Sequence, residues 1–72
     1  MLTDKQRELL NAIETYINKW GYSPTIRELC QLTNKKSPGT IVPMLKRLKR
    51  DGYIDYAYNR NRTIRVIKNE SA

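Results

Sequence analysis

The hydrophobic pattern of this 72-residue chain changes its period once, at Gly52, and that change limits the folds open to it. Before Gly52, apolar residues recur every three or four positions, as in amphipathic helices. After it, apolar and polar residues alternate, which is typical of strands with one buried face. So short a chain forms one domain with a small core. We expect an α+β domain over residues 1–68, with helices first and a strand pair last, and a disordered polar tail over residues 69–72.

The first helix is expected between Thr3 and about residue 20. Thr3 and Gln6 fit a capping box, in which each side chain bonds the other residue's free backbone N–H. Gly21 suits the left-handed conformation that often follows a helix end. The inward face is a stripe whose aromatic residues we expect to pack in the core rather than stack on bases. The stripe consists of Leu9, Ile13, Tyr16, Ile17 and Trp20.

A short second helix is expected from Thr25 to about residue 33. Thr25 and Glu28 repeat the capping-box spacing, directly after a turn at Pro24. The inward-facing residues of this helix are predicted to be Ile26, Leu29, Cys30 and Leu32. Cys30 is interpreted as a small core residue, because no base accompanies it to make a reactive thiol.

The third helix lies between Ser37 and Gly52, and its start has two alternatives. If Ser37 is the N-cap, Pro38 takes the first helical position, and Pro43 falls inside the helix and distorts it. If residues 37–40 form a type II turn, the helix begins at Thr40, and Pro43 lies in its first turn. Either helix has an apolar face and basic remaining faces, made of Ile41, Leu45 and Leu48 and of Lys46, Arg47, Lys49 and Arg50.

Two alternating stretches, residues 53–58 and 63–67, predict a β-hairpin with Arg60 and Arg62 in its turn. Such a basic hairpin after two helices joined by a tight turn is a wing, which can lie on phosphates or place an arginine in the minor groove. The predicted fold is therefore a winged helix-turn-helix of three helices and a two-stranded β-hairpin wing. Its hairpin would bury Ile54, Tyr56, Ile64 and Val66 and expose Asp55, Arg65 and the turn.

The net charge of +7 is concentrated in the second half of the chain. Residues 1–34 carry four basic and four acidic side chains, whereas residues 35–68 carry ten basic and two acidic ones. The second half alone therefore has a charge of +8, which Glu70 reduces to the total of +7. This segregation favours an anionic partner, and nucleic acid before any other.

The sequence lacks the usual components of active and metal sites. It has no histidine, a single cysteine and no glycine loop of the kind that cradles phosphates. Asp51 and Asp55 are interpreted as solvated charges. We therefore expect a protein that is not an enzyme and uses no cofactor, metal or small-molecule substrate. Without a long apolar run or a signal peptide, it is expected to avoid membranes and to be cytoplasmic, on the nucleoid when bound.

Short motifs along the chain resemble the N-terminal DNA-binding domain of LexA repressors. They are Leu2-Thr3 with Gln6, Pro24-Thr25 with Glu28, Ser37-Pro38, Leu45, Leu48, Gly52, Ile54 and the pair Ile64-Arg65. The resemblance covers about residues 2–67 and favours Ser37 as the third N-cap. It implies a bacterial or phage repressor fold whose third helix enters the major groove. LexA proteins also carry a C-terminal self-cleavage and dimerisation domain, so we expect this chain to be a fragment or a free-standing protein, such as one from a mobile element.

The resemblance implies that base-reading residues lie early in the third helix. Ser37 matches the family there, but the positions that follow offer few hydrogen bonds, namely Gly39, Thr40, Val42 and Pro43. The Thr40 methyl group and Val42 can touch thymine methyl groups. Backbone contacts are expected from the basic residues Lys35, Lys36, Lys46, Arg47, Arg60 and Arg62, of which Lys46 or Arg47 can also reach guanine.

Two functions remain open from the sequence. The first is binding of double-stranded DNA by a transcriptional regulator, alone or with a second copy on a palindromic site. The second is a protein-interaction module of the same fold that binds a repressor or a polymerase. The poor readout positions favour the second function, as do Tyr53, Tyr56 and Tyr58, because tyrosine is common at protein interfaces.

Overall fold

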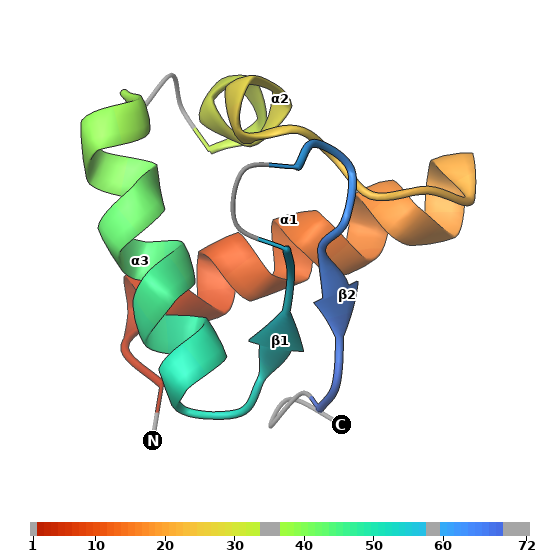
Figure 1. The fold of residues 1–72 in the computed structure, drawn as a ribbon. Coiled ribbons are helices and arrows are strands. Elements are labelled where there is room, and N and C mark those ends of the chain that lie inside the picture. The colour runs from red at the N-terminus through yellow and green to blue at the C-terminus, as the bar shows by residue number, and fades with distance from the viewer. Residues whose placement is uncertain (1, 34–36, 58–59, 69–72) are drawn as a thin grey trace.

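The computed structural model describes residues 2–33, 37–57 and 60–68 (Figure 1). The elements in chain order are helices α1 (Asp4–Trp20), α2 (Ile26–Leu32) and α3 (Pro38–Arg50) and strands β1 (Ile54–Asp55) and β2 (Arg65–Val66). The strands pair antiparallel, with Ile54 opposite Val66 and Asp55 opposite Arg65. The predicted α+β order of three helices and a two-stranded hairpin is confirmed. The predicted tail, residues 69–72, lies outside the described residues.

Both predicted capping boxes are present. Thr3 Oγ1 accepts the Gln6 N–H at 3.1 Å, and the Gln6 side chain accepts the Thr3 N–H at 3.0 Å. Thr25 and Glu28 make the same pair of bonds at 3.1 and 2.8 Å. Gly21 follows α1 with a φ of +79°, in the left-handed region. These local contacts set the starts of α1 and α2 and the end of α1.

The start of α3 agrees with the Ser37 alternative. Ser37 has an extended backbone at the N-cap, and Pro38 is the first helical residue. The Ser37 hydroxyl lies 3.4 Å from the Thr40 hydroxyl and, within the part of the chain that the structure describes, does not cap a helix N–H. The helix continues through Pro43. Gly52, just past its end, has a φ of +85°, as the stop signal predicted.

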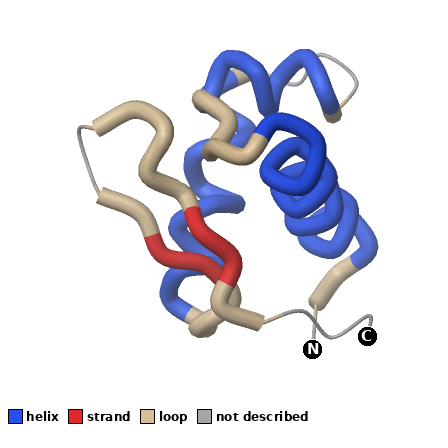
Figure 2. Tube along the Cα trace, turned by 90° about the vertical axis from the view of Figure 1, so that its right-hand side faces the viewer, coloured by secondary structure: helices blue, strands red, loops and turns tan. Residues whose placement is uncertain are grey.

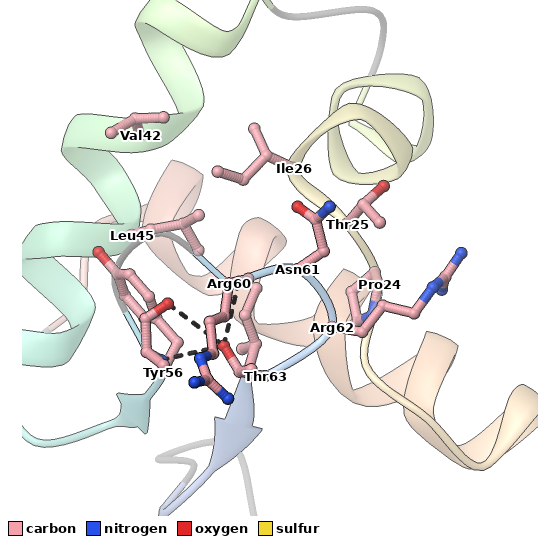
Figure 3. A pocket seen from close by; sticks show the side chains of 12 residues that line it. Pro24, Thr25, Ile26, Val42, Leu45, Tyr56, Arg60, Asn61, Arg62 and Thr63 are labelled. Carbon is pink, nitrogen blue, oxygen red and sulfur yellow. Dashed lines mark hydrogen bonds between the residues drawn. The ribbon is translucent and has the colours of Figure 1, made fainter.

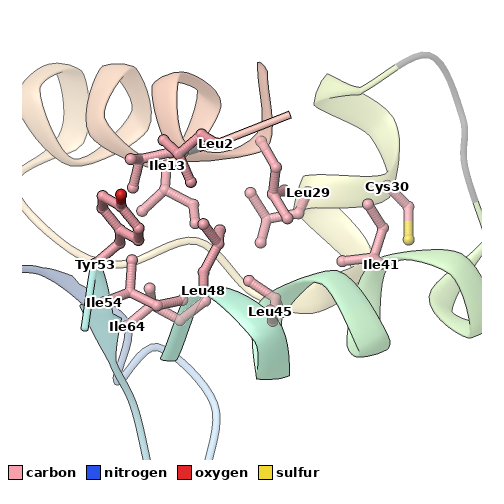
Figure 4. Packing of buried hydrophobic residues seen from close by; sticks show 12 residues of the cluster. Leu2, Ile13, Leu29, Cys30, Ile41, Leu45, Leu48, Tyr53, Ile54 and Ile64 are labelled. Atoms are coloured by element: carbon pink, nitrogen blue, oxygen red, sulfur yellow. The ribbon is translucent and has the colours of Figure 1, made fainter. Parts of the chain in front are cut away.

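The core lies between the three helices and the hairpin (Figure 4). Every element contributes to it, and the hairpin stands at one side of the helical body (Figure 2). The predicted burial of Cys30 is confirmed. Among the described residues, the core cluster consists of Leu2, Leu9, Leu10, Ile13, Leu29, Cys30, Ile41, Leu45, Leu48, Tyr53, Ile54 and Ile64.

Three residues that were predicted to face inward are exposed instead. Trp20 and Leu32 are each 51% exposed and Ile26 is 37% exposed. Trp20 and Leu32 are the last residues of α1 and α2, and Ile26 is the first of α2, so all three lie at helix ends beyond the small core. The Trp20 ring packs beside that of Tyr16, with centroids 6.2 Å apart. Tyr16 itself is half-buried, and its hydroxyl donates to a carboxylate of α2.

Two interpretations of hairpin residues were wrong. Tyr53 is 6% exposed and belongs to the core, so it is not available to an interface. Asp55 is not merely solvated, because its carboxylate lies 3.1 Å from Arg65 and 3.7 Å from Lys49. The hydrogen bond from Arg65 holds the pKa of Asp55 below its ordinary value. Tyr58, another proposed interface residue, lies outside the described residues.

Candidate nucleic-acid interface

The outer side of α3 forms an exposed surface along the whole helix. Ile41, Leu45 and Leu48 are at most 1% exposed and hold the opposite side against the core. Because helical residues recur every three or four positions, the outermost line of the helix consists of Gly39, Pro43, Lys46 and Arg50. Pro38, Thr40 and Arg47 are exposed beside this line, Ser37 is exposed at the N-cap, and Val42 is half-buried.

The predicted contact residues between Ser37 and Arg47 therefore share one surface. Its first half carries small and apolar side chains, and its second half carries the cations of Lys46, Arg47 and Arg50. Lys35 and Lys36, which were expected to contact the backbone, lie outside the described residues. No helix in the described part of the chain is long and apolar enough to cross a membrane.

A groove of about 360 Å³ separates α3 from the hairpin turn (Figure 3). Val42 and Leu45 line it from α3, Ile26 lines it from α2, and Tyr56 and Arg60 line it from the hairpin. The groove is thus apolar on its helical sides, and a cationic side chain stands on its hairpin side. Arg60 is exposed, as a wing contact requires.

Lys49 ties the end of α3 to the hairpin. Its ammonium group donates to the Tyr56 carbonyl at 2.8 Å, lies 3.7 Å from the Asp55 carboxylate and sits over the Tyr56 ring. This basic residue on α3 therefore has a structural role in placing the wing.

Arg62, the second arginine of the hairpin turn, folds back onto the helices. Its guanidinium lies 3.0 Å from the Glu28 carboxylate and donates to the Ser23 carbonyl at 3.1 Å. It also donates to the Tyr16 hydroxyl at 3.3 Å and stacks on the Tyr22 ring, 4.8 Å from its centroid. The predicted contact between Arg62 and DNA stays a prediction, and the structure gives the side chain a second use as a tie between the hairpin turn and α2.

The environment of Glu28 favours its ionised form strongly. The Thr25 backbone N–H, the Tyr16 hydroxyl and the Arg62 guanidinium all donate to its carboxylate. These bonds lower the pKa of Glu28 from its ordinary value of 4.5 to about 2. Glu28 is therefore an anion that serves both the cap of α2 and the attachment of the wing.

The family model for the LexA DNA binding domain matches residues 1–63 of this chain. The chain belongs to the LexA DNA-binding domain family. Its α2, α3 and hairpin are the helix-turn-helix and wing of that family's winged helix.

Full-length relatives agree with this assignment. The chain is 46% identical over 67 residues to the LexA repressor of Desulfatibacillum aliphaticivorans. The matched region spans 93% of this chain and 33% of the relative. It is 38% identical over 65 residues to the LexA repressor of Thermobifida fusca (strain YX), and this match spans 90% of the present chain and 26% of the relative. It is 35% identical over 66 residues to the transcription regulator LexA of Synechocystis sp., and the matched region spans 92% of this chain and 32% of the relative. The chain spans about a quarter to a third of the length of these relatives.

Sequence reasoning missed the second role of Glu28 in this LexA-family domain. Its spacing from Thr25 identified it as a capping residue, but nothing in the sequence linked it to Arg62, which lies 34 positions later. Only the fold brings the hairpin turn onto the start of α2. An arginine in a turn that otherwise faces water is a weak signal for such a pairing.

Proposed function

We propose that this domain binds double-stranded DNA as the reading module of a transcriptional repressor, with the outer side of α3 in the major groove and the hairpin on the adjoining backbone. The observation that carries the proposal is the coincidence of the family match with an exposed α3 flanked by the hairpin. In this role the domain acts by occupying its site on DNA, without catalysis. Relatives of similar sequence bear the name LexA repressor.

The shape of α3 suits the major groove. A groove about 12 Å wide admits one α-helix with its side chains. The core-facing side of α3 is fixed by buried leucines and an isoleucine, so its outer side can enter the groove without unpacking the domain. Lys46, Arg47 and Arg50, further along the helix, are then placed to reach phosphates on the rim.

The hairpin extends the contact beyond the groove. Arg60 is exposed on it and lines the groove between α3 and the hairpin turn. DNA backbone passing between the recognition helix and the wing would meet this cation, or the arginine would enter the neighbouring minor groove. Lys35 and Lys36 are proposed to add backbone contacts before α3. A second copy bound to a palindromic site would repeat the interaction in the next half-site.

The proposal is tested by measuring affinity for duplex DNA as a function of salt. If about six phosphate contacts form, affinity should fall about 10³-fold between about 50 and 200 mM salt. Arg47→Glu and Arg60→Glu should each weaken binding and flatten the salt dependence. Lys19→Glu is the matched control, because it reverses one exposed charge in the last turn of α1, at the other side of the molecule from α3.

Binding that does not change with salt would refute the proposal. So would equal losses from Lys19→Glu and Arg47→Glu, because net charge alone would then explain the affinity.

A further inference from the structure

Gly39 occupies an exposed helical position where the packing of the domain does not require a glycine. A Cβ added there would meet one atom among the described residues, the Ser37 hydroxyl oxygen at 3.7 Å, which is an ordinary contact. The backbone of Gly39 is also outside the left-handed region in which glycine is favoured. Glycine weakens a helix relative to alanine, so Gly39 lowers the stability of α3, and no contact among the described residues explains why it is there. A missing side chain does, however, allow another molecule to approach the helix closely.

The described surface around Gly39 has two hydrogen-bonding side chains, those of Ser37 and Thr40, and their hydroxyls lie 3.4 Å from each other. The other residues between positions 38 and 43 carry only apolar side chains or none. Pro43 is exposed one turn beyond Gly39, on the same outermost line of the helix. Each helical residue advances by about 100°, so Thr40 and Val42 lie on opposite sides of this line. The first half of α3 therefore presents methyl groups and ring carbons around a gap.

We propose that the first half of α3 reads DNA by close apolar contact with thymine methyl groups rather than by hydrogen bonds to base edges. This inference rests on the proposed function, since it assigns the chemistry by which that surface recognises its site. In the major groove the 5-methyl group of thymine marks both the A·T pair and its orientation. Gly39 lets the helix approach the bases, and the Thr40 methyl group, Val42 and Pro43 surround the thymine methyl groups.

Replacing thymine by uracil in the DNA tests the contact directly. Duplexes that bind the wild-type domain are first selected from a random pool, and each thymine of a selected duplex is then replaced by deoxyuridine, which removes only the methyl group. We expect about a fourfold loss of affinity at each contacted thymine, the factor that corresponds to burying one such carbon. The salt dependence should not change, because no phosphate contact is removed.

The variant Gly39→Ala tests the gap from the protein side. The added methyl group should raise the thermal midpoint through better helix propensity, yet lower the affinity for the selected duplex by about tenfold, because it occupies the space meant for the DNA. Thr15→Ala is the matched control, since it also improves helix propensity at an exposed position, on α1. It should raise the thermal midpoint and leave the affinity unchanged.

The outcomes separate this inference from the proposed function. If no uracil substitution weakens binding and Gly39→Ala binds like the wild type, apolar reading is wrong while DNA binding stands. If Gly39→Ala lowers the thermal midpoint, the glycine is needed for the helix geometry one turn before Pro43. The uracil substitutions then decide alone. A loss of affinity supports the inference, and unchanged affinity overturns it. If the wild type selects no sequence and binds without salt dependence, both the inference and the proposed function fail.

Discussion

Arg62 lies in a turn with exposed neighbours, but its side chain makes an internal contact. It has a φ of +57°, a left-handed conformation that is uncommon for arginine, and its guanidinium bonds the Glu28 carboxylate, the Ser23 carbonyl and the Tyr16 hydroxyl. Several bonds from one planar group hold it in a defined direction. Arg60, two positions earlier, is exposed.

A double-mutant cycle tests whether Arg62 acts through Glu28. Arg62→Gln and Glu28→Gln should each lower the thermal midpoint by a few degrees, because the pair is partly exposed but held by several bonds. In the Glu28→Gln background, Arg62→Gln should have a much smaller effect than in the wild type. Glutamine is chosen at position 28 because its amide oxygen can still accept the Thr25 N–H.

The same variants distinguish a structural role for Arg62 from a phosphate contact. If Arg62 contacted a phosphate, Arg62→Gln would reduce the slope of log affinity against log salt by about 0.9, equally in both backgrounds. Additive effects on the thermal midpoint together with that change in slope would contradict the structural role.

Helix starts were the part of the fold most accessible from the sequence. The starts at Thr3 and Thr25 each depend on a capping box within three positions, so local patterns could identify them, whereas the residues near Ser37 left two possible starts for α3. Burial at the helix ends was not accessible, because whether Trp20 or Leu32 meets the core depends on how far each helix extends past its neighbours. The candidate surface on α3 was predicted from the spacing of apolar and basic residues within that helix. The attachment of the wing through Arg62 and Glu28 could not be predicted in this way, because these residues lie 34 positions apart in the sequence.

Pro43 makes α3 less stable than its sequence could allow. Inside a helix, proline removes the hydrogen bond to the carbonyl four residues back, here that of Gly39, and its ring crowds that carbonyl. Pro43→Ala should therefore raise the free energy of unfolding by about 1–3 kcal/mol, measured by urea denaturation. Pro38→Ala is the control, because proline is well suited to a first helical position and its replacement should not stabilise the domain. An unchanged free energy for Pro43→Ala would contradict this account.

Across the whole domain, two described acidic residues join elements that are distant in sequence. Glu28 attaches the hairpin turn to α2, and Asp55 links β1 to β2 and to the end of α3. The basic and neutral halves of the sequence therefore do not form separate basic and neutral halves of the folded domain. Some of the basic side chains of the second half, such as Arg62 and Lys49, pair with carboxylates of the domain itself, and other basic side chains lie on the outer surface of α3.

Acid should destabilise the domain through these carboxylates. Both have a lower pKa in the fold than in the unfolded chain, so their ionised forms stabilise the fold at neutral pH. For Glu28 this stabilisation is complete above pH 4.5, the ordinary pKa of the group, and is lost as the pH falls toward its folded pKa of about 2. The thermal midpoint of the wild type should fall through this range, and that of Glu28→Gln should fall less steeply. Parallel profiles for the two proteins would contradict the assignment.

The paired part of the hairpin is short, and this affects how binding data on this domain are interpreted. β1 and β2 contribute two residues each, and a hairpin of this size is not stable by itself. Its position depends first on the burial of Ile54 and Ile64 in the core, and ionic ties from Lys49 to Asp55 and from Arg62 to Glu28 add to this. Dissolved ions weaken such exposed ties as well as contacts with phosphates. Ionic strength thus acts twice, and a count of phosphates taken from the wild-type salt slope alone will be too high.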